Sequence, residues 1–277
     1  MLTLEFMYHA FAAAGIVALL TGFIGYFLLL RREAFAGHAL SHIGFAGATG
    51  AGLLGISPFA GLLVFSLFAG GLIGFIGPQL RDRDIAIGLV LSASMGLGLL
   101  FLHFYTHYAT QVTSLLFGNI FAVDTVILYD LVGLALFCLA VMLFFMRPLL
   151  FATLQPDLAE TRGISLRWVS IVFLMLVACI TVACVQVTGI LLTFSLMIGP
   201  AAVARQWGKT IWRALVVSVF LALFEAWSGI VASWYTDLPV SFWISFFSFV
   251  IYSISLFFFQ KKNIISKVFI NIILYKE

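Results

Sequence analysis

Two histidines that stand four residues apart are the part of this sequence best suited to chemistry. His38 and His42 occur in the segment GHALSH at residues 37–42, within a long run of apolar and small residues. In a helix, residues at this spacing stack on one face. Two imidazoles in an apolar environment are costly unless they bind something, and imidazole is a common ligand of divalent transition metals. The pair therefore predicts a metal-binding site.

A third candidate ligand is a carboxylate in another apolar segment. Glu225 follows Arg213 by twelve residues, and His42 follows Arg32 by ten. At about 1.5 Å per helical residue, both side chains would lie roughly 15–18 Å from a basic segment end, near the middle of a hydrocarbon layer about 30 Å thick. Ionisable residues at that depth are functional candidates by default. We therefore expect His38, His42 and Glu225 to be metal ligands, the alternative being that they lock neighbouring helices together.

The elements that position these residues are predicted to be membrane-spanning helices. The chain has 277 residues, of which 64% are hydrophobic and 9% are charged, and its mean hydropathy is +1.19. No soluble core needs so much apolar sequence. Apolar stretches of spanning length cover residues 10–30, 37–56, 58–78, 85–105, 124–146, 168–187, 188–206, 214–235 and 238–260. The sequence thus predicts an all-α, polytopic membrane bundle with eight to nine transmembrane segments.

Two domains are expected, a transmembrane domain over residues 1–262 and a C-terminal tail over 263–277 that is interfacial or disordered. The basic residues predict the orientation of the first of these. With Arg31 and Arg32 in the cytoplasm, all 14 Lys and Arg residues fall on the same side, as the positive-inside rule requires. This arrangement predicts an outside amino terminus, an inside carboxyl terminus and nine crossings, or eight if the first segment lies in the interface.

Two shorter segments have signals of their own. The longest cytoplasmic loop, residues 154–165, has Pro156 where a helix would begin and Gly163 where it would end, which predicts a short helix across the cytoplasmic face. Residues 110–123 are apolar but too short to span, and both flanks should lie outside. We expect a re-entrant or interfacial helix there.

Several enzyme chemistries are disfavoured. The segment 208–210 resembles the end of a phosphate-binding loop, but that loop needs glycine where Val203 stands, so no ATP site is predicted. Membrane di-iron enzymes need more histidines, gathered on one membrane face, than the five in this chain. His103 and His107 repeat the four-residue spacing, but on the opposite side from His38. The three cysteines lack metal-ligand spacing.

Four motifs in order carry a family resemblance. They are GHALSH at 37–42 after two arginines, PDLA at 156–159 with Gly163, TGILLT at 188–193 leading into MIGPAAVA at 197–204, and YTDLP at 235–239. Over about residues 10–260 the chain resembles the zinc/manganese/iron permease subunits of bacterial ATP-binding-cassette importers. The resemblance implies a multi-pass protein of the bacterial cytoplasmic (inner) membrane that acts with a second permease subunit, expected to be another copy of itself. A cytoplasmic ATPase and an extracytoplasmic metal-binding protein are the other implied partners.

The resemblance also implies roles for particular residues. The loop at 154–165 resembles the coupling helix that fits a groove on the ATPase, with contacts expected from Asp157, Leu158, Ala159 and Gly163. His42 matches the family's motif histidine, whereas His38 stands where many members have aspartate. Exchanging an oxygen ligand for nitrogen should favour zinc over manganese. The expected protein is therefore a transport subunit, not an enzyme, with Zn²⁺ (or Mn²⁺ or Fe²⁺) as cargo, no resident cofactor and no nucleic-acid partner.

Two other transport functions fit the sequence. One is a related permease for a metal chelate or a vitamin, which would need a wider cavity and would not need the histidine pair. The other is an ion-driven secondary carrier without an ATPase, in which Glu225 and Asp130 would carry protons.

Overall fold

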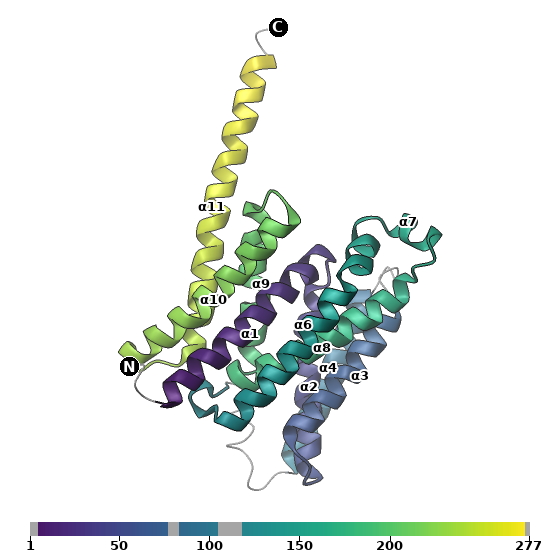
Figure 1. Cartoon of the computed structure of the whole chain (residues 1–277), viewed down its shortest axis with the longest axis vertical. Coiled ribbons are helices and arrows are strands. Elements are labelled where there is room, and N and C mark those ends of the chain that lie inside the picture. Colours follow the sequence, from purple (N-terminus) through teal and green to yellow (C-terminus); the bar gives the residue numbers. More distant parts are fainter. Residues whose placement is uncertain (1–4, 77–82, 105–117, 275–277) are drawn as a thin grey trace.

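The computed structural model describes residues 5–76, 83–104 and 118–274, which form helices joined by short links (Figure 1). The elements in chain order are α1 (Glu5–Leu30), α2 (Ala34–Leu53), α3 (Pro58–Ile76), α4 (Arg83–His103), the 3₁₀ turn η1 (Ile120–Ala122), α6 (Thr125–Leu154), α7 (Pro156–Thr161), α8 (Leu166–Thr188), α9 (Ile190–Trp207), α10 (Ile211–Thr236) and α11 (Val240–Leu274).

The predicted all-α membrane bundle is confirmed. Eight of the described helices are long and apolar enough to cross a membrane. The remaining long helix, α2, has 20 residues and is mostly buried among the others. Most of its glycines and alanines are buried, which shows that other helices pack against them, whereas its two histidines are half-buried.

Helix α6 is longer than its sequence suggested. The expected span ended at residue 146, before Arg147 and Pro148, but the helix continues through the proline to Leu154. A proline inside a membrane helix is tolerated where neighbouring groups compensate for its missing N–H. Here Leu149 and Ala152, which follow the proline, are both buried against the bundle. Packing therefore extends α6 by two turns beyond the predicted stop.

Two other predicted segments are described only partly. Of the expected short helix at 110–123, residues 110–117 lie outside the described ranges, and the rest includes η1. The backbone of residues 263–274 continues helix α11 without a break. The interfacial position expected for residues 263–277 stays a prediction.

The two ends of the bundle differ in charge. Figure 1 shows α7, the α9–α10 link and the far end of α11 at one end, and the start of α1 with η1 at the other. Arg31, Arg162 and Arg205 lie in helix ends or links at the α7 end, which we call the basic end. This distribution agrees with the predicted orientation, in which the basic end is cytoplasmic.

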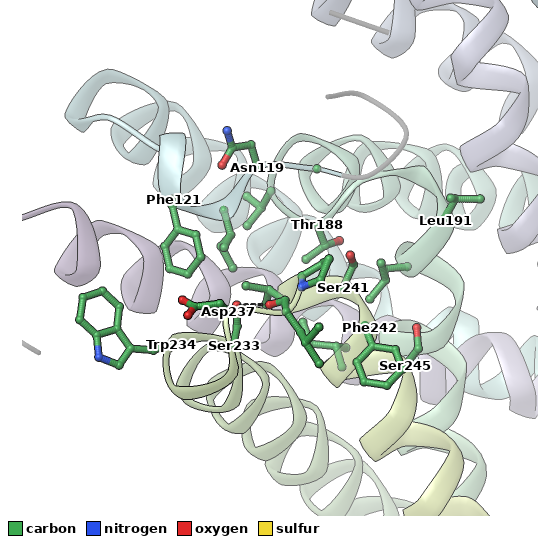
Figure 2. Close-up of a pocket in the computed structure, with 18 of the residues that line it drawn as sticks. Asn119, Phe121, Thr188, Leu191, Ser233, Trp234, Asp237, Ser241, Phe242 and Ser245 are labelled. Carbon is green, nitrogen blue, oxygen red and sulfur yellow. Dashed lines mark hydrogen bonds between the residues drawn. The ribbon is translucent and has the colours of Figure 1, made fainter. Parts of the chain in front are cut away.

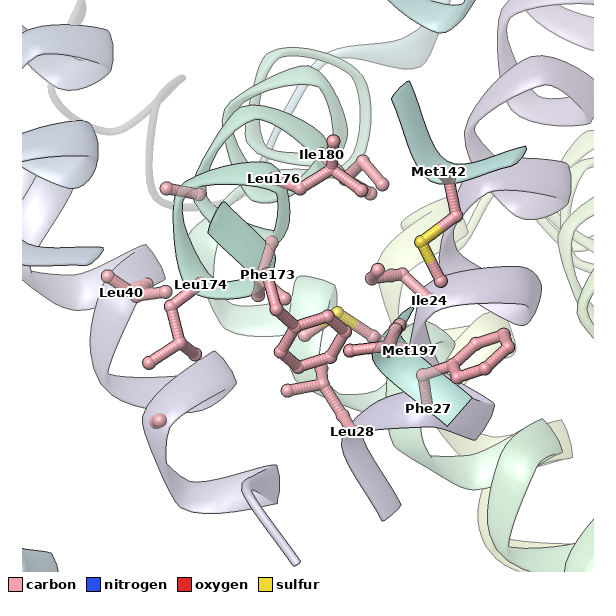
Figure 3. Close-up of a cluster of buried hydrophobic side chains, with 14 of the residues drawn as sticks. Ile24, Phe27, Leu28, Leu40, Met142, Phe173, Leu174, Leu176, Ile180 and Met197 are labelled. Carbon is pink, nitrogen blue, oxygen red and sulfur yellow. The ribbon is translucent and has the colours of Figure 1, made fainter. Parts of the chain in front are cut away.

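The centre of the bundle is one continuous apolar cluster between helices α1, α2, α6, α8 and α9 (Figure 3). Its larger members include Ile24, Phe27, Leu28, Leu40, Met142, Phe173, Leu174 and Met197. Backbones also approach closely at small residues, as in other membrane bundles. A Cβ atom on Gly61 of α3 would overlap the carbonyl of Gly47 in α2. These contacts hold α2 rigidly, and α2 is the helix that carries the histidine pair.

Candidate metal site and coupling helix

The two histidines of α2 face the same way, as their spacing predicts. The ring centroids of His38 and His42 are 4.6 Å apart, and the ring planes are inclined by 72°. Small residues around them (Gly37, Ala39 and Ser41) are buried, while both imidazoles are half-buried. The helix therefore presents two imidazoles side by side inside the bundle.

The neighbour of this pair on another helix is aromatic. The ring of Phe194, on α9, lies 4.9 Å from the ring of His38 at an angle of 69°. The Nδ1 atom of His38 is buried and has no hydrogen-bond partner within the described ranges. A buried ring nitrogen normally has a partner. This nitrogen is therefore available to a ligand that reaches it.

Glu225 lies on another helix, α10. It is fully buried, with the Ser248 side chain nearby, and neither carboxyl oxygen has a hydrogen bond of good geometry among the residues described. In the part of the chain that the structure covers, no three or more His, Cys, Asp or Glu side chains are grouped so that they could hold a metal ion. The structure thus brings His38 and His42 together but does not add Glu225 to them.

A cavity of about 850 Å³ opens at the end of the bundle opposite the basic end. Figure 2 shows Asn119, Thr188, Asp237 and Ser241 around it, from the segment before η1, the end of α8, the α10–α11 link and the start of α11. The Ser233 hydroxyl donates to the Leu238 carbonyl at 2.6 Å, which ties the α10–α11 link to the end of α10.

Leu191 of α9 lines the cavity, and Phe194, which contacts His38, follows it by three residues, about one helical turn along α9. The sequence predicted breaks between spans near residues 187–188 and 235–238, but not that the links there enclose a common space. The sequence signal that could have suggested this shared cavity is a polar turn with glycine or proline in each of two apolar hairpins.

Helix α7 forms as predicted at the basic end. Pro156 is its first residue, and Gly163 follows it in the left-handed conformation, with φ = 79°. Asp157 and Leu158 are exposed, whereas Ala159 is fully buried against the core. A partner at this end would therefore touch Asp157 and Leu158 directly, while Ala159 fixes the helix to the bundle.

The other sequence candidates lie apart from this site. Asp130 of α6 and His103 of α4 are both exposed, and His107 lies outside the described ranges. Cys138 of α6 is buried, Cys179 of α8 is half-buried, and both are free thiols. None of these groups is near enough to others of its kind to form a site with three metal ligands within the ranges described.

Comparison with known proteins gives consistent matches over nearly the whole chain. Residues 3–259 match the model of the ABC 3 transport family. The chain is 28% identical over 268 residues to the manganese transport system membrane protein MntC of Halalkalibacterium halodurans, covering 96% of this chain and 92% of that protein. It is 30% identical over 238 residues to a Treponema pallidum protein named "Probable metal transport system membrane protein", covering 86% and 89%. The solved structure of PsaBC from Streptococcus pneumoniae in complex with Fab matches with a TM-score of 0.81 and 24% identity, over 91% of both chains.

Proposed function

Because this chain belongs to the ABC 3 transport family, we propose that it is the membrane permease of an ATP-driven importer for divalent transition-metal ions, with zinc preferred. It is a multi-pass protein of the bacterial inner membrane. The observation that carries the proposed cargo is the His38–His42 pair, with ring centroids 4.6 Å apart and a buried His38 Nδ1 atom that has no partner in the described part of the chain. A cation that takes imidazole ligands would use both groups.

Zinc is proposed as cargo on coordination chemistry. Imidazole suits zinc, whereas carboxylate and water suit manganese. Two nitrogen ligands side by side therefore favour zinc. Manganese is the second candidate, because several relatives carry names that refer to manganese transport, including MntC and ScaB. Glu225 is proposed as an oxygen ligand that the ion meets at a different step of its passage, since it lies apart from the pair.

We propose that the ion crosses the bundle from the mouth cavity to the histidine pair. A binding protein outside the membrane delivers the ion to the mouth cavity around Asp237. The ion passes Phe194 and binds His38 and His42, with water or a second copy of the chain completing its coordination. Two protein ligands hold an ion loosely, which suits transport because a tightly held ion would not leave.

The energy for the cycle is proposed to come from a partner. An ATPase of the ATP-binding-cassette type would bind the cytoplasmic face at α7, through the exposed Asp157 and Leu158. Its conformational change would tilt α6 and α8, the helices that flank α7, and so switch the access of the histidine pair. The proposed complex holds two permease chains and two ATPases.

The decisive experiment is metal uptake into vesicles that contain the permease with its ATPase and are supplied with the metal-binding protein. His42→Ala should abolish zinc uptake while leaving expression and ATPase binding unchanged. His38→Asp should keep uptake and shift the preference toward manganese, because it supplies an oxygen ligand. His103→Ala, which changes an exposed histidine at the end of α4, is the matched control and should behave as wild type.

Two outcomes would redirect the assignment. Zinc uptake by His42→Ala at the wild-type rate would make the pair a packing feature and favour a metal chelate or vitamin as cargo. Uptake that follows the membrane potential and not ATP would favour an ion-driven secondary carrier, for which Glu225 and Asp130 are the proton-carrying candidates.

A further inference from the structure

The turn between α1 and α2 holds an ion pair that is almost completely removed from solvent. Arg31 donates to both carboxyl oxygens of Glu33, from Nε at 3.3 Å and from Nη2 at 3.2 Å. The Arg31 side chain is 6% exposed, and that of Glu33 is 2% exposed. A two-point contact of this kind fixes the geometry as well as the charge. Since Glu33 immediately precedes α2, the pair fixes the start of that helix.

The same guanidinium group also reaches two other helices. Its Nη1 atom donates to the hydroxyl of Thr153, in the last turn of α6, at 3.2 Å. Its Cζ atom lies 5.0 Å from the ring centroid of Phe173, on α8, in a cation–π arrangement. One buried side chain thus joins the start of α2 to α6 and α8.

These contacts lie between the two functional elements of the molecule. Thr153 is three residues before Pro156, the first residue of α7. Helix α6 precedes α7 in the chain, and helix α8 follows it. Glu33 is five residues before His38, about 7.5 Å along the helix at 1.5 Å per residue. Arg31 therefore connects the helices that flank α7 with the helix that carries the histidine pair.

We propose that Arg31 is a positioning residue that transmits movement of α7 to the histidine pair through its contacts with Thr153 and Glu33. This proposal rests on the proposed function, because it assigns to α7 the contact with an ATPase. A buried guanidinium that loses a partner is left with unpaired N–H groups, which is costly. When α6 moves, Arg31 can keep its contacts with both Thr153 and Glu33 only if the start of α2 moves with α6.

Thr153 offers a way to cut this connection without removing a buried charge. Its hydroxyl donates to the carbonyl of Leu149 within α6 at 2.6 Å and accepts from Arg31. Thr153→Val keeps the shape and loses both bonds, whereas Thr153→Ser keeps the hydroxyl. Thr21 in α1 is the matched control, because its buried hydroxyl donates within its own helix to the carbonyl of Val17 at 2.8 Å. Thr21→Val therefore loses bonds within one helix only.

The experiment measures metal uptake and ATP hydrolysis together in vesicles that contain the permease and its ATPase and are supplied with the metal-binding protein. Thr153→Val should keep basal ATP hydrolysis and the KM for metal uptake, and should lower the metal transported per ATP about five-fold or more, the lower end of typical coupling between sites. Thr21→Val and Thr153→Ser should both retain the wild-type ratio. Equal ratios for Thr153→Val and Thr21→Val would overturn the proposal.

A second arm tests whether the effect passes through Arg31. Arg31→Lys keeps the charge but not the forked geometry, so Thr153→Val should cause no further loss in that background. An equal additional loss there would show that Thr153 acts without Arg31, and would overturn the proposal. If the wild-type complex shows no metal-stimulated ATP hydrolysis, the proposed function fails and this proposal fails with it. If the wild-type complex shows metal-stimulated ATP hydrolysis but Thr153→Val keeps the wild-type ratio of metal transported per ATP, only this proposal fails.

Discussion

Substitution of Gly163 tests the role of α7 through the backbone that ends it. Gly163 follows the helix with φ = 79°, and a Cβ atom added there would meet no atom of the described residues within 4 Å. The cost of a side chain is therefore backbone strain alone. For an ordinary residue in the left-handed region this strain is about 1–2 kcal/mol. A β-branched residue is a stronger outlier, and asparagine tolerates the conformation.

The backbone strain at position 163 would weaken the hydrogen bonds at the C-terminal end of α7. The N–H of Gly163 donates to the carbonyl of Glu160, and the N–H of Ile164 donates to that of Ala159, both at 2.9 Å. A penalty of about 1–2 kcal/mol lowers the ratio of the native α7 conformation to its alternatives by a factor of roughly 5–30. Gly163→Val should lower metal transport per ATP by at most that factor, while Gly163→Asn should stay near wild type.

The assay compares transport, ATP hydrolysis and thermal unfolding of the purified complex for the two variants. Gly133→Val is the control, since Gly133 lies within α6 and an added Cβ would also meet nothing within 4 Å. The unfolding temperature of Gly163→Val should fall by no more than the few degrees that about 1–2 kcal/mol of backbone strain produces in a chain of this size. Wild-type transport in Gly163→Val, or equal loss in the valine and asparagine variants, would refute the role assigned to α7.

Two further predictions concern the bundle. A topology reporter fused after Asp237 should be found outside the cell and one after Lys262 inside; a cytoplasmic signal from the first would contradict the predicted orientation. Gly61→Val should destabilise the purified permease by about 1–3 kcal/mol, because its Cβ would press on the α2 backbone at Gly47. Gly71→Val, with open space around the added Cβ, should not, and equal unfolding temperatures for both would be evidence against this close contact.

Local signals predicted much of this molecule. Hydropathy predicted the membrane-spanning helices because each must cross the same thickness of hydrocarbon. Pro156 and Gly163 predicted the limits of α7 because each residue has a strong conformational preference. The facing of His38 and His42 followed from helical spacing alone.

Contacts between distant segments were not predictable in the same way. Arg31 meets Thr153 across 122 residues of sequence, and Phe194 meets His38 on another helix. Such pairs depend on how small and large side chains interlock between helices, which no single segment specifies. Helix α6 continued through Pro148 for the same reason, because packing outweighed a local stop signal.

The central claim is that His38 and His42 bind the transported ion. The most direct test is X-ray absorption at the zinc edge, measured on the complete permease–ATPase complex loaded with zinc. We expect imidazole nitrogens at about 2.0–2.1 Å from zinc, with one of them lost in His42→Ala and none lost in His103→Ala. An unchanged spectrum and an unchanged zinc affinity in His42→Ala would contradict the claim.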